Sequence, residues 1–297
     1  MNFTRALTEG QSAADGSLLC VGLDPDPTRF PAAWRNDPRH LYDFCAAIVD
    51  ATHDLVCAFK PQIAFFAAHR AEDQLERLIQ HIHRTAPGVP VILDAKRGDI
   101  GSTAVQYTRE AFERYCADAV TLSPLMGLDS LEPFLQYDGK GLILLCRTSN
   151  PGGDELQARR LEGSADAPSE PLYERIARLA AGPWNRNGQL GLVVGATYPA
   201  ELARVRALAP TLPLLVPGIG AQGGDAAATV RAGWHKGAPI LVSSSRAVLY
   251  AGVDDGDGSG FADAARAVAV ATHAELERAR LPPSVPPTVR LNVRAQR

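Results

Sequence analysis

The sequence contains no long hydrophobic run and no excess of charge of either sign. No apolar stretch approaches the roughly 20 residues that a membrane-spanning helix needs, and residues 1–17 lack the charged and then apolar order of a signal peptide. The 30 Lys and Arg residues are balanced by 33 Asp and Glu residues, so the formal net charge is −3 and no basic face for nucleic acid is indicated. We therefore expect a cytoplasmic protein that binds neither membranes nor nucleic acids.

Residue patterns that are typical of metal centres are missing as well. The five cysteines match no CxxC spacing, and no His-x-x-x-His pair has a third ligand nearby. A free cysteine behaves as a small hydrophobic residue, so we expect buried, reduced thiols, with a nucleophilic thiol as the minor alternative. The cysteines are Cys20, Cys45, Cys57, Cys116 and Cys146.

The chain does contain a repeated alternation of short apolar runs and longer helical patterns. The apolar runs are continuous rather than alternating, which is typical of strands buried on both faces in a parallel sheet. They cover residues 18–23, 55–59, 89–93, 119–122, 141–146, 190–194, 214–216 and 240–242. Helical spacing of apolar residues occurs at 73–83, 104–116, 173–180, 200–209, 226–232 and 261–279.

Eight strand–helix repeats predict an α/β fold, a (β/α)8 TIM barrel, and 297 residues suit one such domain. An open doubly wound sheet is the main alternative, but it usually has a Gly-rich turn after its first strand, and the sequence at 22–26 does not provide one. We predict a single barrel domain over residues 1–297, with a Pro-rich C-terminal arm at 282–297. Residues 149–171 read as a loop, either a lid or an insertion without a role, and residues 254–260 read as a solvated turn.

Charged and polar residues gather where the predicted strands end. In a barrel, the loops after the strands carry the catalytic groups, and charges beside buried strands are costly unless they are paired or used. A buried ion-pair network that supports the barrel is the alternative interpretation. The residues at these ends include Asp24, Lys60, Asp94, Lys96, Asp99, Arg147, Ser149 and Arg246.

The cluster at 94–99 carries the most chemical information. Asp94 and Lys96 are two residues apart at a strand end, so their side chains point the same way. A lysine beside carboxylates holds its proton more firmly. Such a group is a poor base but a suitable proton donor to a developing carbanion.

The last two predicted strands indicate a phosphate site. Residues 217–224 form a Gly-rich loop that exposes backbone N–H groups and precedes a helix. Arg246 follows the eighth strand and has the geometry to bind phosphate with two hydrogen bonds. Barrels often bind phosphate between these two loops.

The segment Asp-Ala-Lys-Arg-Gly-Asp-Ile-Gly-Ser-Thr at 94–103 resembles the signature of the orotidine 5′-phosphate decarboxylases. The motif Thr-Ser-Asn-Pro-Gly at 148–152 and the length of the chain resemble those of the longer bacterial subgroup of that family. Further segments resemble the family in its own order. They lie at 22–25, 59–61, 194–197, 217–224 and 244–246.

The resemblance implies decarboxylation of orotidine 5′-phosphate to UMP and carbon dioxide, a step of de novo pyrimidine biosynthesis that uses no metal or organic cofactor. It implies that Lys96 protonates carbon 6 of the ring and that Asp94 lies near the scissile carboxylate. Asp99 and Thr103 would reach into the site of a neighbouring subunit, which implies a homodimer with shared active sites.

The same resemblance implies the substrate contacts. Asp24 and Lys60 would hold the ribose hydroxyls, and Ser149 would contact the pyrimidine. The phosphate would be bound by Gly220, Gln222 and Arg246. Two alternatives stay open from the residues alone: a magnesium-dependent sugar-phosphate decarboxylase or aldolase of the same superfamily, and a non-catalytic barrel that binds a phosphate ligand.

Overall fold

Eight parallel strands form the centre of the molecule, and the computed structural model describes residues 2–13, 16–163, 168–219 and 224–281. The strands are hydrogen-bonded in the order β2-β1-β10-β9-β8-β5-β4-β3. Two further bridges, Phe59 to Val91 and Gln62 to Asp94, join the outer strands β2 and β3 and close the barrel. The strands are β1 (Leu19–Leu23), β2 (Ala58–Pro61), β3 (Ile92–Arg97), β4 (Ala119–Leu122), β5 (Gly141–Arg147), β8 (Leu190–Val194), β9 (Leu214–Pro217) and β10 (Ile240–Ser244).

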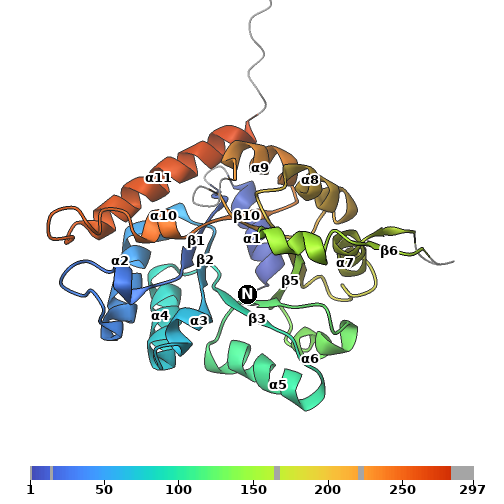
Figure 1. Ribbon diagram of the computed structural model, residues 1–297, viewed down its shortest axis with the longest axis horizontal. Helices are drawn as coiled ribbons and strands as arrows, with labels where there is room; N and C mark the ends of the chain where they lie inside the picture. Colours follow the sequence, from blue (N-terminus) through green and yellow to red (C-terminus); the bar gives the residue numbers. More distant parts are fainter. Residues whose placement is uncertain (1, 14–15, 164–167, 220–223, 282–297) are drawn as a thin grey trace, which may run out of the picture.

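The predicted barrel is therefore confirmed, and the open doubly wound sheet is excluded. Helices surround the strands on all sides (Figure 1). The longer ones are α2 (Leu41–Thr52), α4 (Glu72–Thr85), α5 (Gly101–Arg109), α7 (Leu172–Ala181), α8 (Pro199–Leu208), α9 (Ala226–Gly233) and α11 (Phe261–Arg280). The helix predicted at 104–116 begins earlier, and a π-helical segment, η4 (Glu110–Arg114), continues it.

Short helices fill several connections between the strands. The short α-helices are α3 (Ile63–Ala67), α6 (Glu132–Leu135) and α10 (Arg246–Leu249). The 3-10 helices are η1 (Pro27–Arg29), η2 (Pro38–His40), η3 (His53–Leu55), η5 (Leu128–Ser130) and η6 (Pro151–Glu155).

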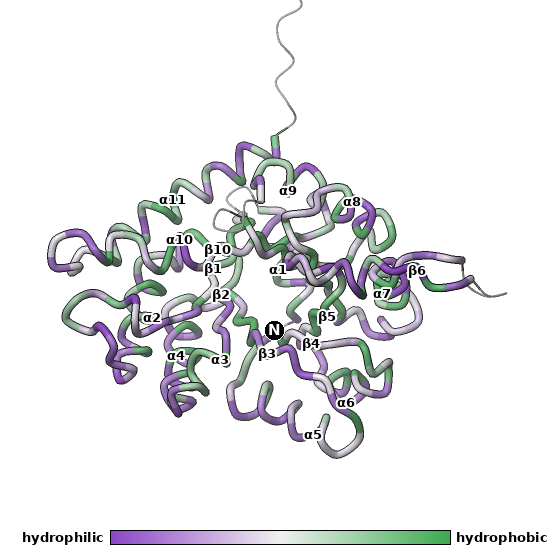
Figure 2. The backbone as a smooth tube through the Cα atoms, viewed as in Figure 1, coloured by the Kyte–Doolittle hydropathy of each residue, from purple (hydrophilic) through white to green (hydrophobic). Residues whose placement is uncertain are grey.

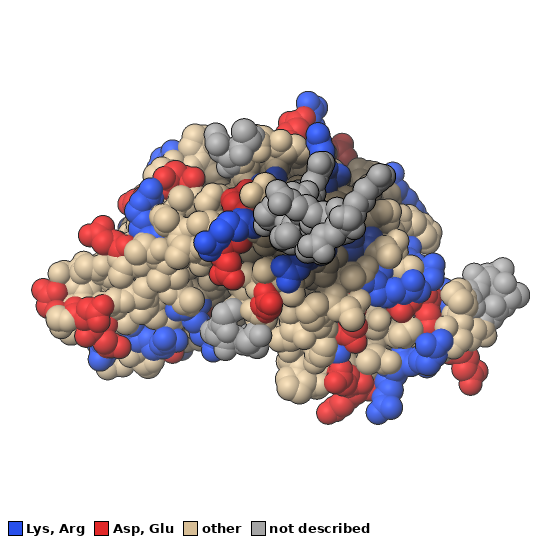
Figure 3. Space-filling view, turned by 90° about the horizontal axis from the view of Figure 1, so that it is seen from above, with Lys and Arg blue, Asp and Glu red and all other residues tan. Residues whose placement is uncertain are grey.

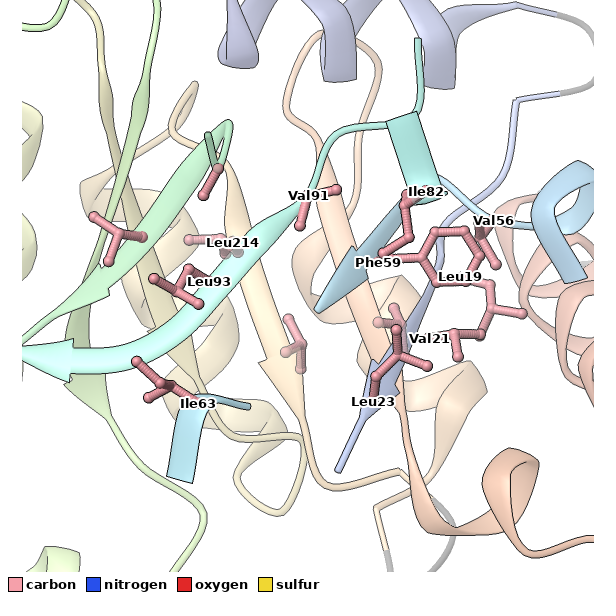
Figure 4. Close-up of a cluster of buried hydrophobic side chains, with 14 of the residues drawn as sticks. Leu19, Val21, Leu23, Val56, Phe59, Ile63, Ile82, Val91, Leu93 and Leu214 are labelled. Atoms are coloured by element: carbon pink, nitrogen blue, oxygen red, sulfur yellow. The ribbon is translucent and has the colours of Figure 1, made fainter. Parts of the chain in front are cut away.

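Alternate residues of the strands face the inside of the barrel and the surrounding helices, which explains why the apolar runs are continuous. Leu19 and Val21 of β1 pack toward the helices, whereas Cys20 between them faces inward. Figure 4 shows the outer layer, in which Phe59 of β2 lies beside Ile82 of α4. Figure 2 shows the same division as hydrophobic strands and mixed hydropathy along the helices.

The N-terminal helix α1 (Phe3–Ser12), which the sequence did not lead us to predict, closes one end of the barrel interior. Phe3 and Leu7 are buried against one inward-facing residue from each of the eight barrel strands. These residues are Cys20, Ala58, Ile92, Ala119, Ile143, Val193, Leu215 and Leu241. The backbone N–H of Phe3 donates to the carbonyl of Gly139, just before β5, so the helix lies at the N-terminal ends of the strands.

The predicted loop at 149–171 is only partly a loop. It contains η6 and a short antiparallel pair, β6 (Arg160–Leu161) and β7 (Glu170–Pro171). Each of these strands has only two residues, one charged and one apolar, so they leave no apolar pattern in the sequence. Residues 254–260 form turns, as predicted.

Within the described part of the chain, no group of three or more His, Cys, Asp and Glu side chains is placed to hold a metal ion.

The prediction of buried, reduced thiols is correct for three cysteines and wrong for Cys116, while Cys57 is half-buried. All five thiols are free, and Cys20, Cys45 and Cys146 are buried. Burial raises the pKa of Cys20 to about 12, so this thiol stays protonated and unreactive. Cys116 is exposed because it lies just after η4, where the backbone turns through a positive φ of 53° at the surface.

Other expectations concern surface and termini. No helix in the described ranges has the length and apolar character needed to cross a membrane. Acidic and basic side chains are interspersed over the face seen in Figure 3, in keeping with the nearly balanced charge. The predicted C-terminal arm at 282–297 lies outside the described residues.

Candidate active site

A cavity of about 590 Å³ opens at the C-terminal ends of the barrel strands. Its lining comes from all around the barrel, because parallel strands deliver the residues at their ends to one rim. The predicted residues that line it are Asp24, Lys60, Asp94, Lys96, Ser149 and Arg246. The structure therefore brings together six side chains that lie as much as 222 positions apart in the sequence (24 to 246).

Four of these side chains form an alternating row of charges. The Lys60 Nζ donates to Asp94 Oδ2 at 2.9 Å, and the Lys96 Nζ donates to Asp94 Oδ1 at 2.6 Å. Asp24 Oδ1 lies 3.9 Å from the Lys60 Nζ. Lys60 and Asp94 are only 6% and 7% exposed, whereas Lys96 reaches into the open part of the cavity.

The charges in this row stabilise one another against burial. Burial alone would raise the pKa of the Asp94 carboxyl, but the ammonium groups of Lys60 and Lys96 outweigh it and hold that pKa well below its usual range. Burial would likewise lower the pKa of Lys60, but the carboxylates of Asp94 and Asp24 outweigh it and raise that pKa above its usual value. Both groups are therefore charged at neutral pH.

Asp24 keeps an acceptor atom free. Its Oδ1 is shielded from solvent and accepts no hydrogen bond from the described residues. The hydroxyl of Tyr250 accepts from the Asp26 N–H at 2.7 Å and donates to the Asp24 carbonyl at 2.8 Å, which fixes the backbone around Asp24. A buried carboxylate oxygen that accepts no hydrogen bond within the protein is suited to accept one from a ligand hydroxyl.

The opposite side of the cavity is formed by the ends of β5, β9 and β10. Ser149 follows β5, Gly218 follows β9, and Arg246 begins α10 after β10. Gly218 has a positive φ of 104°, a conformation that glycine adopts without strain. The predicted phosphate ligands Gly220 and Gln222 lie outside the described residues.

Two predicted site residues do not line the cavity formed by the described part of their own chain. Asp99 follows β3, and its Oδ1 accepts the N–H of Ile100 at 2.8 Å. Thr103 is exposed on the first turn of α5. Neither side chain therefore belongs to the lining of this cavity.

Arg147 was a candidate from its place at a strand end, but its side chain lies beneath the loop that follows β5. It donates to Glu201 Oε2 at 2.7 Å and to Asp154 Oδ1, and its guanidinium stacks on the Tyr198 ring. The side chain is fully buried, and it links β5 to α8 and to η6. Arg147 therefore supports the cavity wall rather than lining it.

Sequence reasoning missed Thr121, which lines the cavity at the end of β4. A threonine at the end of an apolar run gives no signal in the sequence. Its importance comes from the way in which β3 and β4 pair, which only the structure reveals.

A closed (β/α)8 barrel with paired lysine and aspartate side chains at the C-terminal rim defines an enzyme of the barrel class that acts on a small polar molecule. Comparison with known proteins shows the family. The family model described as "Orotidine 5'-phosphate decarboxylase / HUMPS family" matches residues 17–255. The chain belongs to this family.

Individual relatives agree with the family assignment. Orotidine 5′-phosphate decarboxylase of Paracidovorax citrulli is 70% identical over 275 residues, which cover 92% of this chain and 98% of that protein. The protein of the same name from Verminephrobacter eiseniae is 68% identical over 280 residues, which cover 94% and 100%. The structure of Leishmania donovani OMP decarboxylase superimposes with a TM-score of 0.79 at 40% identity and covers 94% of this chain and 99% of that one.

Proposed function

We propose that this enzyme decarboxylates orotidine 5′-phosphate to UMP and carbon dioxide in pyrimidine biosynthesis, with Lys96 as the proton donor. The observation that carries the proposal is the 2.6 Å contact between the Lys96 ammonium and Asp94 at the barrel rim. The reaction needs a charged pair of this kind, and the relatives of the chain bear the name of this decarboxylase.

Lys96 supplies both charge stabilisation and the proton. When the bond between carbon 6 and the carboxylate breaks, carbon dioxide leaves and the electron pair stays on carbon 6. The positive Nζ of Lys96 stabilises that developing charge and then transfers one proton to the carbon. Lys96 is the lysine of the row that reaches into the open cavity, whereas Lys60 is buried against Asp94.

Asp94 has two effects in this scheme. Its carboxylate holds the Lys96 Nζ in place, and Lys60 on its other oxygen keeps it ionised. An ionised Asp94 beside the substrate carboxylate repels it, and this repulsion is relieved as carbon dioxide forms.

The remaining cavity residues bind the parts of the substrate that do not react. The free Oδ1 of Asp24 and the Lys60 ammonium suit the ribose hydroxyls. Arg246 suits the phosphate, together with Gly220 and Gln222, and Ser149 suits the pyrimidine. Binding energy from the remote phosphate contributes to catalysis by holding the ring against Lys96.

We also propose a homodimer in which Asp99 and Thr103 serve the partner's cavity. Neither residue lines the cavity formed by the described part of its own chain, and large apolar side chains are exposed on the same part of the chain: Ile100 and Val105 beside them, and Leu125 and Met126 after β4. Exposed apolar groups of this kind are typical of a subunit interface.

The cytoplasmic location stays a prediction from the sequence.

The two alternative functions are not favoured. A magnesium-dependent sugar-phosphate enzyme would not be expected among relatives that carry the decarboxylase name at up to 71% identity. A non-catalytic barrel would have no use for Lys96 beside Asp94 at the cavity mouth.

The proposal is tested by the loss of orotidine 5′-phosphate absorbance on mixing with the purified, EDTA-treated protein. We expect turnover that magnesium does not increase. A folded protein that consumes no orotidine 5′-phosphate, or one that needs magnesium, would contradict the proposal and would favour the sugar-phosphate alternative.

A further inference from the structure

The pairing of β3 with β4 is interrupted beside the proposed proton donor. Ile92 pairs with Ala119 and Leu93 with Val120, but the next pair is Arg97 with Leu122. Three residues of β3, at 94–96, therefore lie opposite a single residue of β4, Thr121. In such a bulge, backbone N–H groups of the longer strand lose their partners in the ladder.

The Thr121 hydroxyl replaces those missing partners. It accepts from the N–H of Ala95 at 3.0 Å and from the N–H of Lys96 at 3.0 Å, and it donates to Asp94 Oδ1 at 2.8 Å. A hydroxyl has one donor and two acceptor positions, so all of its hydrogen-bonding capacity is used. The residue is 1% exposed, so water does not compete for these bonds.

The backbone that Thr121 holds is strained. Lys96 has a φ of +49°, a conformation that a long side chain adopts only when its surroundings impose it. This conformation directs the Lys96 side chain to Asp94 Oδ1, the same oxygen that accepts from Thr121. One hydroxyl thus contacts both the backbone of the proton donor and the carboxylate that orients it.

We propose that Thr121 is a positioning residue of the decarboxylation, which fixes the Lys96 ammonium for proton transfer to carbon 6. The proposal rests on the function proposed above, because it assigns Thr121 a role through Lys96 and Asp94 rather than through contact with the reacting atoms. It is independent of packing, because the hydroxyl rather than the volume of the side chain makes the three bonds.

The variant Thr121→Val keeps the shape of the side chain and removes the hydroxyl. We expect kcat to fall about 100-fold, the effect of misplacing a catalytic group by about 1 Å, with KM for orotidine 5′-phosphate nearly unchanged. Thr121→Ser retains the hydroxyl and should keep most of the wild-type kcat. If Thr121→Val does not fold, Thr121→Cys, with its weaker donor and acceptor, should likewise have a kcat well below that of Thr121→Ser.

Thr52→Val is the matched control. Thr52 is fully buried in α2, and its hydroxyl donates only to the Ile48 carbonyl at 2.7 Å. This variant loses a buried threonine hydroxyl far from the rim, so kcat and KM should both stay at wild-type values. A kcat of Thr121→Val equal to that of Thr121→Ser would overturn the proposal, because the hydroxyl would then have no role.

A crystal structure of Thr121→Val tests the positioning without any turnover. We expect residues 94–96 to relax, with a negative φ at Lys96 or with its Nζ moved away from Asp94. An unchanged backbone and an unchanged Lys96–Asp94 contact would overturn the positioning role of Thr121. Failure of the proposed function is a different result, namely no consumption of orotidine 5′-phosphate by the wild-type protein.

Discussion

At the scale of single residues, Asp94 is the centre of the site because each of its oxygens contacts an ammonium group. Lys60 binds Oδ2, and Lys96 binds Oδ1 together with the Thr121 hydroxyl. Such a buried carboxylate is stable only while it is ionised and its partners are protonated. The site should therefore leave a signature in the dependence of protein stability on pH.

We predict that Asp94→Asn lowers the free energy of unfolding by about 3 kcal/mol at neutral pH, because two ammonium groups lose their carboxylate partner. The folded protein holds the pKa of Asp94 below its ordinary value of 3.8. The stabilisation is therefore complete above pH 3.8 and is lost as the pH falls toward the folded pKa. Urea unfolding of both proteins between about pH 2 and pH 7 measures this; a stability difference that does not shrink in acid would contradict the predicted pairing.

Arg246 is expected to act on catalysis from a distance. Arg246→Ala should lower kcat/KM roughly 100-fold, because charge-assisted hydrogen bonds to the phosphate are lost. This corresponds to a loss of about 3 kcal/mol in transition-state stabilisation. Steady-state kinetics with Arg231→Ala as the control measures the effect, since Arg231 is also exposed but does not line the cavity. Equal losses in the two variants would mean that general surface charge, and not a phosphate site, attracts the substrate.

The sequence was informative about single residues where charge marks a strand end. Asp24, Lys60, Asp94 and Lys96 could be predicted because charged groups beside apolar strands need an explanation. Thr121 could not be predicted, since a hydroxyl gives no such signal and its partners depend on the strand register. Arg147 carried the signal of a site residue but lies beneath the cavity wall.

At the scale of elements, the segment from Thr148 to Gln157 forms one wall of the cavity. It is held by the buried Arg147 beneath it and by hydrogen bonds between its own side chains. Asp154 contacts the buried Arg147, and Gln157 exchanges hydrogen bonds with Thr148 through its Nε2 and Oε1. Gly153 is packed closely against this support: a Cβ atom there would lie 2.7 Å from Arg147 Nη1 and 3.0 Å from Gln157 Oε1. A side chain at this position would therefore have to displace the Arg147 guanidinium.

Gly153→Ala should displace this segment and lower kcat/KM roughly tenfold, because Ser149 and the cavity wall would move with it. Gly152→Ala is the matched control, since a Cβ at Gly152 meets only Asn150 Nδ2 at an ordinary 3.4 Å. Kinetics with orotidine 5′-phosphate should show a clear loss for the first variant and a small one for the second. A loss of the same size in both would mean that glycine flexibility, and not the contact with Arg147, determines the wall.

Helices and strands could be predicted where burial leaves a hydrophobic pattern in the sequence. All eight barrel strands could be located because both of their faces are buried. Helix α1 was missed because only Phe3, Leu7 and Gln11 are buried among ten mostly polar residues. The pair β6–β7 was missed because each strand has only two residues, one charged and one apolar, and so carries no hydrophobic pattern.

At the scale of the whole molecule, we propose that one chain contributes only part of the site. The cavity formed by the described residues is lined by Lys96 and Asp94 but not by Asp99, whose neighbour Ile100 is an exposed apolar residue. If the active unit is a symmetric dimer, each cavity combines Lys96 of one subunit with Asp99 of the other. Two inactive variants should then restore one another.

Lys96→Ala and Asp99→Ala, each nearly inactive alone, should recover about a quarter of wild-type activity when equal amounts are refolded together. Half of the resulting dimers are hybrids, and each hybrid has one intact site of two. Lys96→Ala mixed with Lys60→Ala is the control, because these two residues lie in the same cavity and no hybrid site is intact. Recovery in the control mixture, or none in the test mixture, would argue against a shared site.

The most direct test of the account is the turnover of orotidine 5′-phosphate by Lys96→Ala beside the wild type, with UMP binding measured on both proteins. The account predicts that kcat falls by roughly 10⁴-fold, while UMP binds both proteins with similar affinity because Arg246 and Asp24 are untouched. A Lys96→Ala variant that still decarboxylates within tenfold of the wild-type rate would show that the proton comes from another group.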